Sequence, residues 1–92
     1  MQGYDLTELL KYINPSMLDY QEWVNVGMAL KEEGYTASDW DSWSRNDTRY
    51  KSGECFRKWG TFTSSGGSLV TGGTIYEYAK RGGFVPPQKN TE

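Results

Sequence analysis

The sequence contains no histidine and a single cysteine, Cys55. A lone cysteine cannot form a disulfide within the chain, which fits a reducing compartment. The same absences leave too few ligands for a zinc site and no Cys–His or Ser–His pair for nucleophilic catalysis. No apolar run approaches the ~20 residues of a membrane helix, and the first residues do not resemble a signal peptide. We therefore expect a cytoplasmic protein that binds no metal or other cofactor and does not enter a membrane.

The chain is instead rich in aromatic side chains, with four Trp, seven Tyr and three Phe among its 92 residues. Each buried ring removes about 150–250 Å² from water, so these side chains can build a dense core in a chain long enough for one domain. We expect that domain to span residues 5–85. Residues 1–4 are expected to form a short lead-in, and residues 86–92, which begin with Pro86-Pro87, a linker or tail.

Apolar residues recur at spacings of three and four along the chain, which predicts helices, and no convincing alternation predicts a strand. A helix start is indicated where Asp or Thr is followed three residues later by Glu or Asp, the pattern of a capping box. Three such starts are predicted, at Asp5, Asp19 and Thr36.

The ends of the helices and the second half of the chain are predicted from glycine, serine and spacing. Gly34 should end the second helix in the left-handed conformation. A fourth helix is expected over about residues 53–62 with Ser52 as its N-cap, and a fifth should begin within residues 71–74 and end at Gly82-Gly83. The expected fold is all-α, a compact bundle of about five short helices in a single domain.

Gly27 lies in the middle of the predicted central helix, beside its apolar stripe. A mid-helix glycine costs about 1 kcal/mol relative to alanine, so we expect a helix carrying Trp40 or Trp43 to cross close to the backbone there. Tyr35 and Tyr50, in predicted loops, are candidates for exposed rings, and Trp40 is left open between core and surface. The expected structural core comprises Trp23, Val26, Gly27, Leu30, Trp43, Trp59, Phe62, Ile75 and Ala79.

The net charge of −2 hides an asymmetry along the chain. Residues 1–43 carry two Lys against eight Asp and Glu, whereas residues 44–92 carry eight Lys and Arg against four acidic residues. The basic half can contact an anionic partner such as the phosphates of a nucleic acid, although an ordinary solvated face partly paired with Asp47 and Glu54 is the alternative. The candidate nucleic-acid-binding residues are Arg45, Arg49, Lys51, Arg57 and Lys58, followed by Lys80 and Arg81.

No other pattern predicts catalysis. The Gly-rich stretches at residues 64–68 and 72–74 lack the Gly-Lys-Ser/Thr that a phosphate-binding loop requires. The acidic pairs Asp39/Asp41 and Glu32/Glu33 stand at adjacent or alternate positions of a helix, which do not face one another. We therefore assign no catalytic residue.

Four groups of residues, taken in order, resemble the primase C-terminal domain of the second type, over about Asp5 to Phe84. They are Trp23-x-x-Val26-Gly27-Met28-Ala29-Leu30, then Trp40-Asp41-x-Trp43-Ser44, then Tyr50-x-x-x-Glu54-Cys55-x-x-Lys58-Trp59-x-x-Phe62, and finally Gly73-Thr74-Ile75-x-x-x-Ala79-Lys80-x-Gly82.

The resemblance implies a small helical module found in primases and primase-helicases of phages, plasmids and integrated elements. It implies flanking primase and helicase domains that carry the nucleotidyl transfer and the ATP hydrolysis, in a bacterial or phage-infected cell. The expected function is that of a non-catalytic accessory module in DNA replication that binds single-stranded template DNA or a nucleotide through its basic half. The alternative is a docking or spacer domain between the primase and helicase parts, with the acidic half around Glu32 and Glu33 as its docking face.

Overall fold

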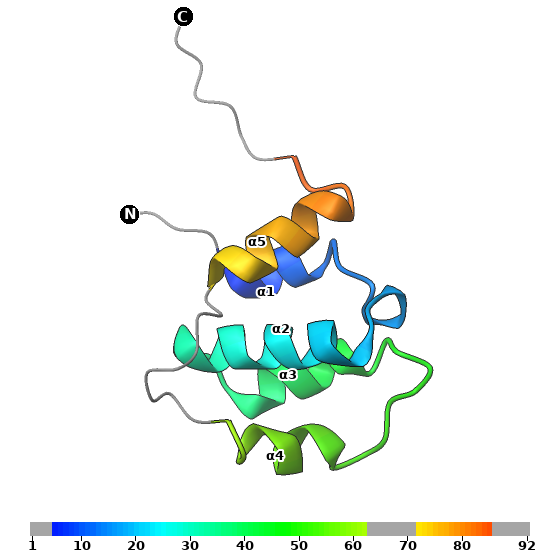
Figure 1. The fold of residues 1–92 in the computed structure, drawn as a ribbon, viewed down its shortest axis with the longest axis vertical. Coiled ribbons are helices and arrows are strands. Elements are labelled where there is room, and N and C mark those ends of the chain that lie inside the picture. The colour runs from blue at the N-terminus through cyan, green and yellow to red at the C-terminus, as the bar shows by residue number, and fades with distance from the viewer. Residues whose placement is uncertain (1–4, 63–71, 86–92) are drawn as a thin grey trace, which may run out of the picture.

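The structure, a computed structural model, describes residues 5–62 and 72–85 of the chain. Within these ranges it contains five α-helices, one short 3-10 helix and no strand, so the all-α prediction is confirmed (Figure 1). The predicted lead-in, the Ser/Gly-rich connection and the tail lie outside the described residues. The elements are α1 (Leu6–Leu10), η1 (Pro15–Met17), α2 (Tyr20–Glu32), α3 (Ala37–Ser44), α4 (Glu54–Trp59) and α5 (Gly72–Arg81).

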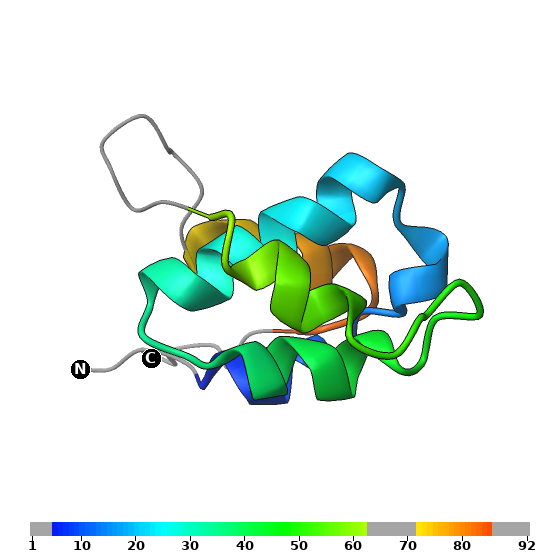
Figure 2. The same cartoon turned by 90° about the horizontal axis from the view of Figure 1, so that it is seen from below.

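The longest helix, α2, lies at the centre of the fold. On one side it packs against α5, which lies beside α1, and on the other it packs against α3 and α4, which also contact each other (Figures 1 and 2). The first and last helices are therefore neighbours in space although they are far apart in sequence. This arrangement separates the side chains of α5 from those of α4.

The capping boxes predicted for α2 and α3 are both present. The Asp19 side chain accepts from the backbone N–H of Glu22, and the Glu22 carboxylate accepts from the N–H of Asp19. Thr36 and Asp39 make the same reciprocal pair at the start of α3. Gly34 follows α2 with a φ of +90°, as predicted.

The starts of α1 and α4 differ from the prediction. Asp5 caps α1 through the N–H of Thr7, whereas the Glu8 carboxylate binds Lys11. The cap of α4 is Gly53, not Ser52. It has a φ of +86°, a left-handed conformation that glycine adopts without strain, and α4 ends at Trp59, earlier than predicted.

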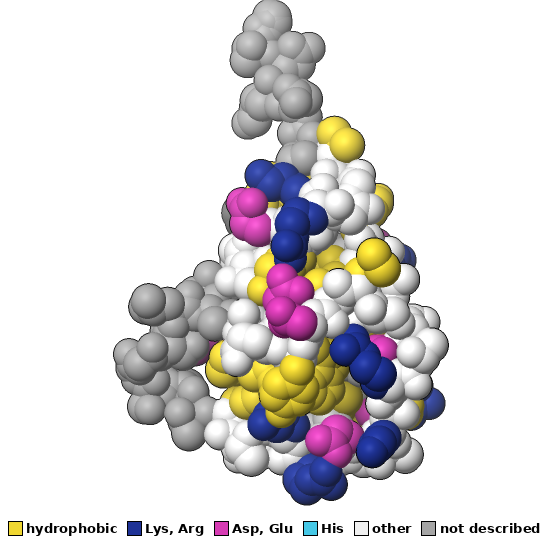
Figure 3. All heavy atoms as spheres, turned by 45° about the vertical axis from the view of Figure 1, so that its right-hand side comes forward, with side chains coloured by type: hydrophobic (Ala, Val, Ile, Leu, Met, Phe, Trp, Pro, Cys, Tyr) yellow, Lys and Arg dark blue, Asp and Glu magenta, His cyan; other side chains and the backbone are white. Residues whose placement is uncertain are grey.

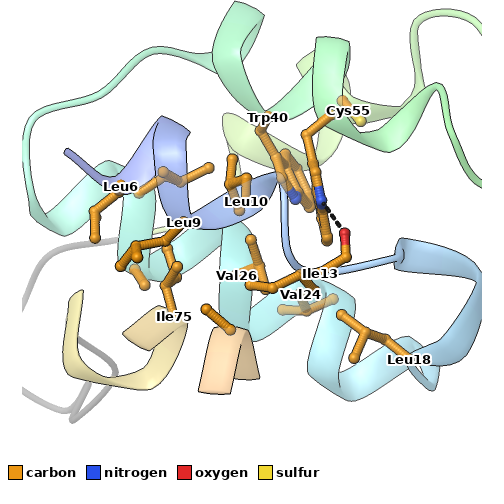
Figure 4. Packing of buried hydrophobic residues seen from close by; sticks show 14 of the residues in the cluster. Leu6, Leu9, Leu10, Ile13, Leu18, Val24, Val26, Trp40, Cys55 and Ile75 are labelled. Carbon is orange, nitrogen blue, oxygen red and sulfur yellow. Dashed lines mark hydrogen bonds between the residues drawn. The ribbon is translucent and has the colours of Figure 1, made fainter. Parts of the chain in front are cut away.

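The core forms around α2 (Figure 4). Gly27 explains how closely α3 approaches this helix. A Cβ atom on Gly27 would lie 2.6 Å from Cε2 of Trp40 and 2.8 Å from Cε2 of Phe62. Trp40, left open by the sequence, is therefore the ring that crosses the glycine, and it is 0% exposed. Of the residues expected in the core, Trp23 and Trp59 are only half-buried. The buried ones are Val26, Gly27, Leu30, Trp43, Phe62, Ile75 and Ala79.

The prediction that Tyr35 and Tyr50 expose their rings is wrong, because both are half-buried and hydrogen-bonded through their hydroxyl groups. The hydroxyl of Tyr35 accepts from the N–H of Leu6 at 2.9 Å and donates to Asp5 Oδ1 at 3.1 Å. The hydroxyl of Tyr50 donates to Asp41 Oδ1 at 2.8 Å. Tyr35 therefore fixes the loop after α2 to the start of α1, and Tyr50 fixes the loop after α3 to α3 itself.

Candidate functional site

Most of the predicted nucleic-acid-binding cations are already engaged with carboxylates. Two of the seven, Lys51 and Lys58, have no ion-pair partner within residues 5–62 and 72–85. Lys51 is exposed, and Lys58 places its Nζ over the ring of Tyr20, 5.3 Å from the ring centroid. The ion pairs of the other five are Arg45 with Asp41 (3.1 Å), Arg49 with Asp47 (2.9 Å), Lys80 with Glu77 (3.6 Å), Arg81 with Glu22 (3.2 Å), and Arg57 with Glu54.

The seven cations belong to different elements of the fold. Lys80 and Arg81 belong to α5, whereas Arg57 and Lys58 belong to α4, and α2 lies between these two helices (Figure 1). The predicted cations are therefore spread over helices on both sides of α2.

Arg49 holds the loop between α3 and α4 against η1. Its Nη2 donates to the carbonyl oxygens of Pro15 at 3.0 Å and Leu18 at 2.8 Å, and to Asp47 Oδ2 at 2.9 Å. The hydrogen bond from Arg49 lowers the pKa of the Asp47 carboxyl below its ordinary value, although the burial of Asp47 acts in the opposite direction. A phosphate that engaged Arg49 fully would have to replace bonds that maintain the fold.

Asp41, which the sequence did not assign to any site, organises the end of α3. Its carboxylate is buried, accepts from Nε and Nη2 of Arg45 at 3.2 and 3.1 Å, and accepts from the Tyr50 hydroxyl. The bond to Asp41 raises the pKa of Tyr50 above its ordinary value. Beside it, Trp23 Nε1 donates to Ser44 Oγ at 2.9 Å. These bonds fix two aromatic rings, Trp23 and Tyr50, on adjacent elements.

A pocket of about 310 Å³ opens between the start of α2, the end of α3 and the segment that leads into α4. Three aromatic rings line it, from Tyr20, Trp23 and Tyr50, together with the cations Arg49 and Lys51. Figure 3 shows hydrophobic side chains gathered in a patch on the lower half of the molecule with Lys, Arg, Asp and Glu side chains around it. Of the predicted cations, the fold thus brings Arg49 and Lys51 to the pocket itself and Lys58 to the ring of Tyr20.

Tyr20 is the member of this pocket that the sequence analysis missed. It is the first residue of α2, directly after the Asp19 cap, and it is 56% exposed. The signal available in the sequence was an aromatic residue at the start of a helix, outside the apolar stripe that fills the core.

The remaining chemistry of the described chain is limited. Cys55 lies at the pocket but is 1% exposed, and burial raises the pKa of its thiol, which disfavours the reactive thiolate. Among the residues that the structure describes, no group of three or more Cys, Asp or Glu side chains is placed to hold a metal ion. In the same residues, no helix has both the length and the apolar character needed to cross a membrane.

Comparison with known proteins identifies the family. No curated protein and no solved structure matches the chain. The family model described as Primase C terminal 2 (PriCT-2) matches residues 6–79, which include all five helices except the last residues of α5. Because this match covers most of the 92 residues, the chain belongs to the Primase C terminal 2 family, a primase-associated domain.

Proposed function

We propose that this primase-associated domain binds single-stranded nucleic acid, template DNA above all, and performs no catalysis of its own. The observation that carries the proposal is the pocket, where three aromatic rings lie beside Lys51, which forms no ion pair in the described part of the chain, with Lys58 over the ring of Tyr20. The pocket is also lined by Asp47 and Glu54, whose carboxylates are paired with Arg49 and Arg57. Proteins that bind single strands combine these two elements, because bases stack on rings while the phosphates contact Lys and Arg.

The structure narrows the set of cations on which the proposal rests. Of the seven cations named in the sequence analysis, the proposal rests on Lys51 and Lys58, since the other five already form ion pairs in the described part of the chain. An exposed ion pair contributes little stability, so Arg57 can still turn toward a phosphate, but its charge is partly offset by Glu54.

The test is a titration of the whole chain with a fluorescent single-stranded DNA at several salt concentrations. Each phosphate contact on a single strand contributes about −0.7 to the slope of log K against log salt. We expect Lys51→Gln and Lys58→Gln each to weaken binding and to reduce the magnitude of that slope by about 0.7. The matched control is Lys11→Gln, which removes the same charge at the C-cap of α1, outside the lining of the pocket.

Two results would contradict the proposal. If Lys11→Gln reduces the slope as much as the pocket variants do, the binding follows net charge and does not involve the pocket. If the parent chain binds no strand even at low salt, the domain is a docking or spacer module between primase and helicase parts. The next experiment would then be copurification with those parts, with charge reversal at Glu32 and Glu33.

A further inference from the structure

We infer that the pocket holds one unstacked nucleobase, with the adjacent phosphate on Lys51 and Lys58. The inference rests on the proposed function and names the ligand of the same site. A volume of about 310 Å³ is at the lower end of the range of roughly 300–1,000 Å³ seen for small-molecule pockets. It suits a single base and not a run of stacked bases, and the base can come from a strand or from a free nucleotide.

The rings are held in place before any ligand arrives. Trp23 stacks on Trp40 with ring centroids 4.4 Å apart and an interplanar angle of 29°, so one face of Trp23 is covered, and the same side chain lines the pocket. The ring of Tyr20 packs against that of Trp23, with the ring centroids 5.7 Å apart and an interplanar angle of 43°. Because Trp23 and Tyr50 are also tied by hydrogen bonds, a base that enters loses less free energy to the ordering of side chains.

Several polar atoms of the lining already have partners inside the protein. Trp23 Nε1 donates to Ser44, the Tyr50 hydroxyl donates to Asp41, and both oxygens of Asp47 accept from Arg49. Few groups therefore remain to read the edge of a base. Stacking on rings tolerates every base and varies with the size of the stacked surface, so we expect a purine to be preferred modestly over a pyrimidine.

Lysines next to the rings can contact a phosphate, and the two carboxylates that also line the pocket, Asp47 and Glu54, are paired with Arg49 and Arg57. Lys58 lies 5.3 Å from the Tyr20 ring centroid, and Lys51 lines the pocket, so a phosphate joined to a base on these rings lies within reach of both. In the described part of the chain, neither lysine forms an ion pair that a phosphate would have to displace. A purely apolar ligand would leave these two charges unused, which is why we commit to a nucleotide.

The test compares two single strands of equal length and charge, one of adenines and one made of abasic residues. With the parent chain we expect the adenine strand to bind at least about fivefold more tightly, the lower limit that stacking of one base supplies. The variant Tyr20→Leu keeps an apolar side chain but removes the ring, so it should bring the two affinities together. The matched control Phe56→Leu changes a ring that is 51% exposed on α4 and outside the pocket, and it should preserve the difference.

The two proposals fail in different ways. Equal affinity of the parent chain for the adenine and abasic strands overturns the base pocket, whereas salt-dependent binding of both strands still supports the proposed function. Absence of binding to either strand overturns both. If dAMP competes with the strand, and Tyr20→Leu abolishes that competition, the pocket is supported with a free nucleotide as the source of the base. If the chain discriminates against the abasic strand but dAMP does not compete, the pocket is supported with a strand as the source of the base.

Discussion

Gly27 is the residue on which the packing of the helices depends most directly. Its missing side chain lets the indole of Trp40 lie against the backbone of α2, with Phe62 beside it. Trp40 in turn contacts the rings of Trp23, Trp59 and Phe62, so the glycine sits beneath an aromatic cluster that joins α2, α3 and α4. The rings that cover Gly27 have little room to retreat because interiors are packed at crystal-like density.

The first prediction is that Gly27→Ala destabilises the fold although alanine is the better helix former. A methyl group within 2.6–2.8 Å of two rings forces them to shift, and overpacking of this kind costs about 1–3 kcal/mol. Chemical denaturation followed by tryptophan fluorescence measures the free energy of unfolding. The control is Gly60→Ala, where a Cβ meets its nearest atom at 3.6 Å and should leave that free energy unchanged or slightly higher. Equal stability of Gly27→Ala and the parent would show that the cluster can relax.

At the scale of the element, the helices differ in what holds their ends. Reciprocal capping boxes start α2 and α3, whereas α4, six residues long, starts at a glycine that offers no side chain. The far end of α4 is held from outside, because Lys31 of α2 donates to the carbonyl oxygens of Trp59 at 3.0 Å and Phe62 at 2.9 Å. The starts of α2 and α3 are therefore held by their own capping residues, whereas α4 is held by a side chain of α2.

The second prediction follows from that difference. Asp19→Ala and Thr36→Ala each remove a cap and should lower the free energy of unfolding by about 1 kcal/mol. Ser52→Ala, at the position that the sequence marked as a cap, should change it by less than about 0.5 kcal/mol, since Ser52 makes no cap bond to α4. Thermal and urea denaturation of the three variants give the comparison. A loss at Ser52 as large as that at Asp19 would mean that the hydroxyl, and not Gly53, starts α4.

The contrast between local caps and contacts from other elements also explains which features could be predicted from the sequence. The boxes at Asp19 and Thr36 involve residues three apart, so local pattern is enough to predict them. The burial of Trp40 depends on which ring of α3 lies against Gly27, and the sequence alone left two candidates, Trp40 and Trp43. The start of α4 depends on a backbone conformation, the left-handed φ of Gly53, that competes with an equally plausible serine cap.

The candidate site was predictable to a similar degree. The sequence associated the chain with primases and named seven candidate cations, whose contact with nucleic acid stays a prediction, and Arg45 could have been paired with Asp41 from their i,i+4 spacing. It could not reveal that Arg49 bonds the carbonyl oxygen of Pro15, 34 residues away, or that Tyr20 faces the pocket. Those facts depend on how η1, α2 and the loop before α4 come together.

At the scale of the whole molecule, the Asp5 carboxylate joins two distant segments directly, and the Asp47 carboxylate holds Arg49, which joins two others. Asp5 accepts from the Tyr35 hydroxyl, which joins the start of α1 to the loop after α2. Asp47 accepts from Arg49, which joins the loop after α3 to η1. Hydrogen bonds lower the pKa of both carboxyls in the folded chain, from Thr7 foremost at Asp5 and from Arg49 foremost at Asp47.

The third prediction is that these two ties weaken together in acid. A carboxyl whose pKa is lower in the folded chain contributes stability above its unfolded pKa, near 3.9, and loses it as the pH falls toward the folded pKa. We therefore expect the free energy of unfolding to fall below about pH 4, as the unfolded chain takes up more protons. Asp47→Asn should lower that free energy at pH 7, and its curve should approach that of the parent as the pH falls toward the folded pKa of Asp47, because the parent carboxyl then takes up a proton. Denaturant unfolding from pH 2 to 7 gives both curves, with Asp5→Asn as the second arm. Parallel curves for the parent and Asp47→Asn would mean that the bond between Asp47 and Arg49 does not link folding to pH.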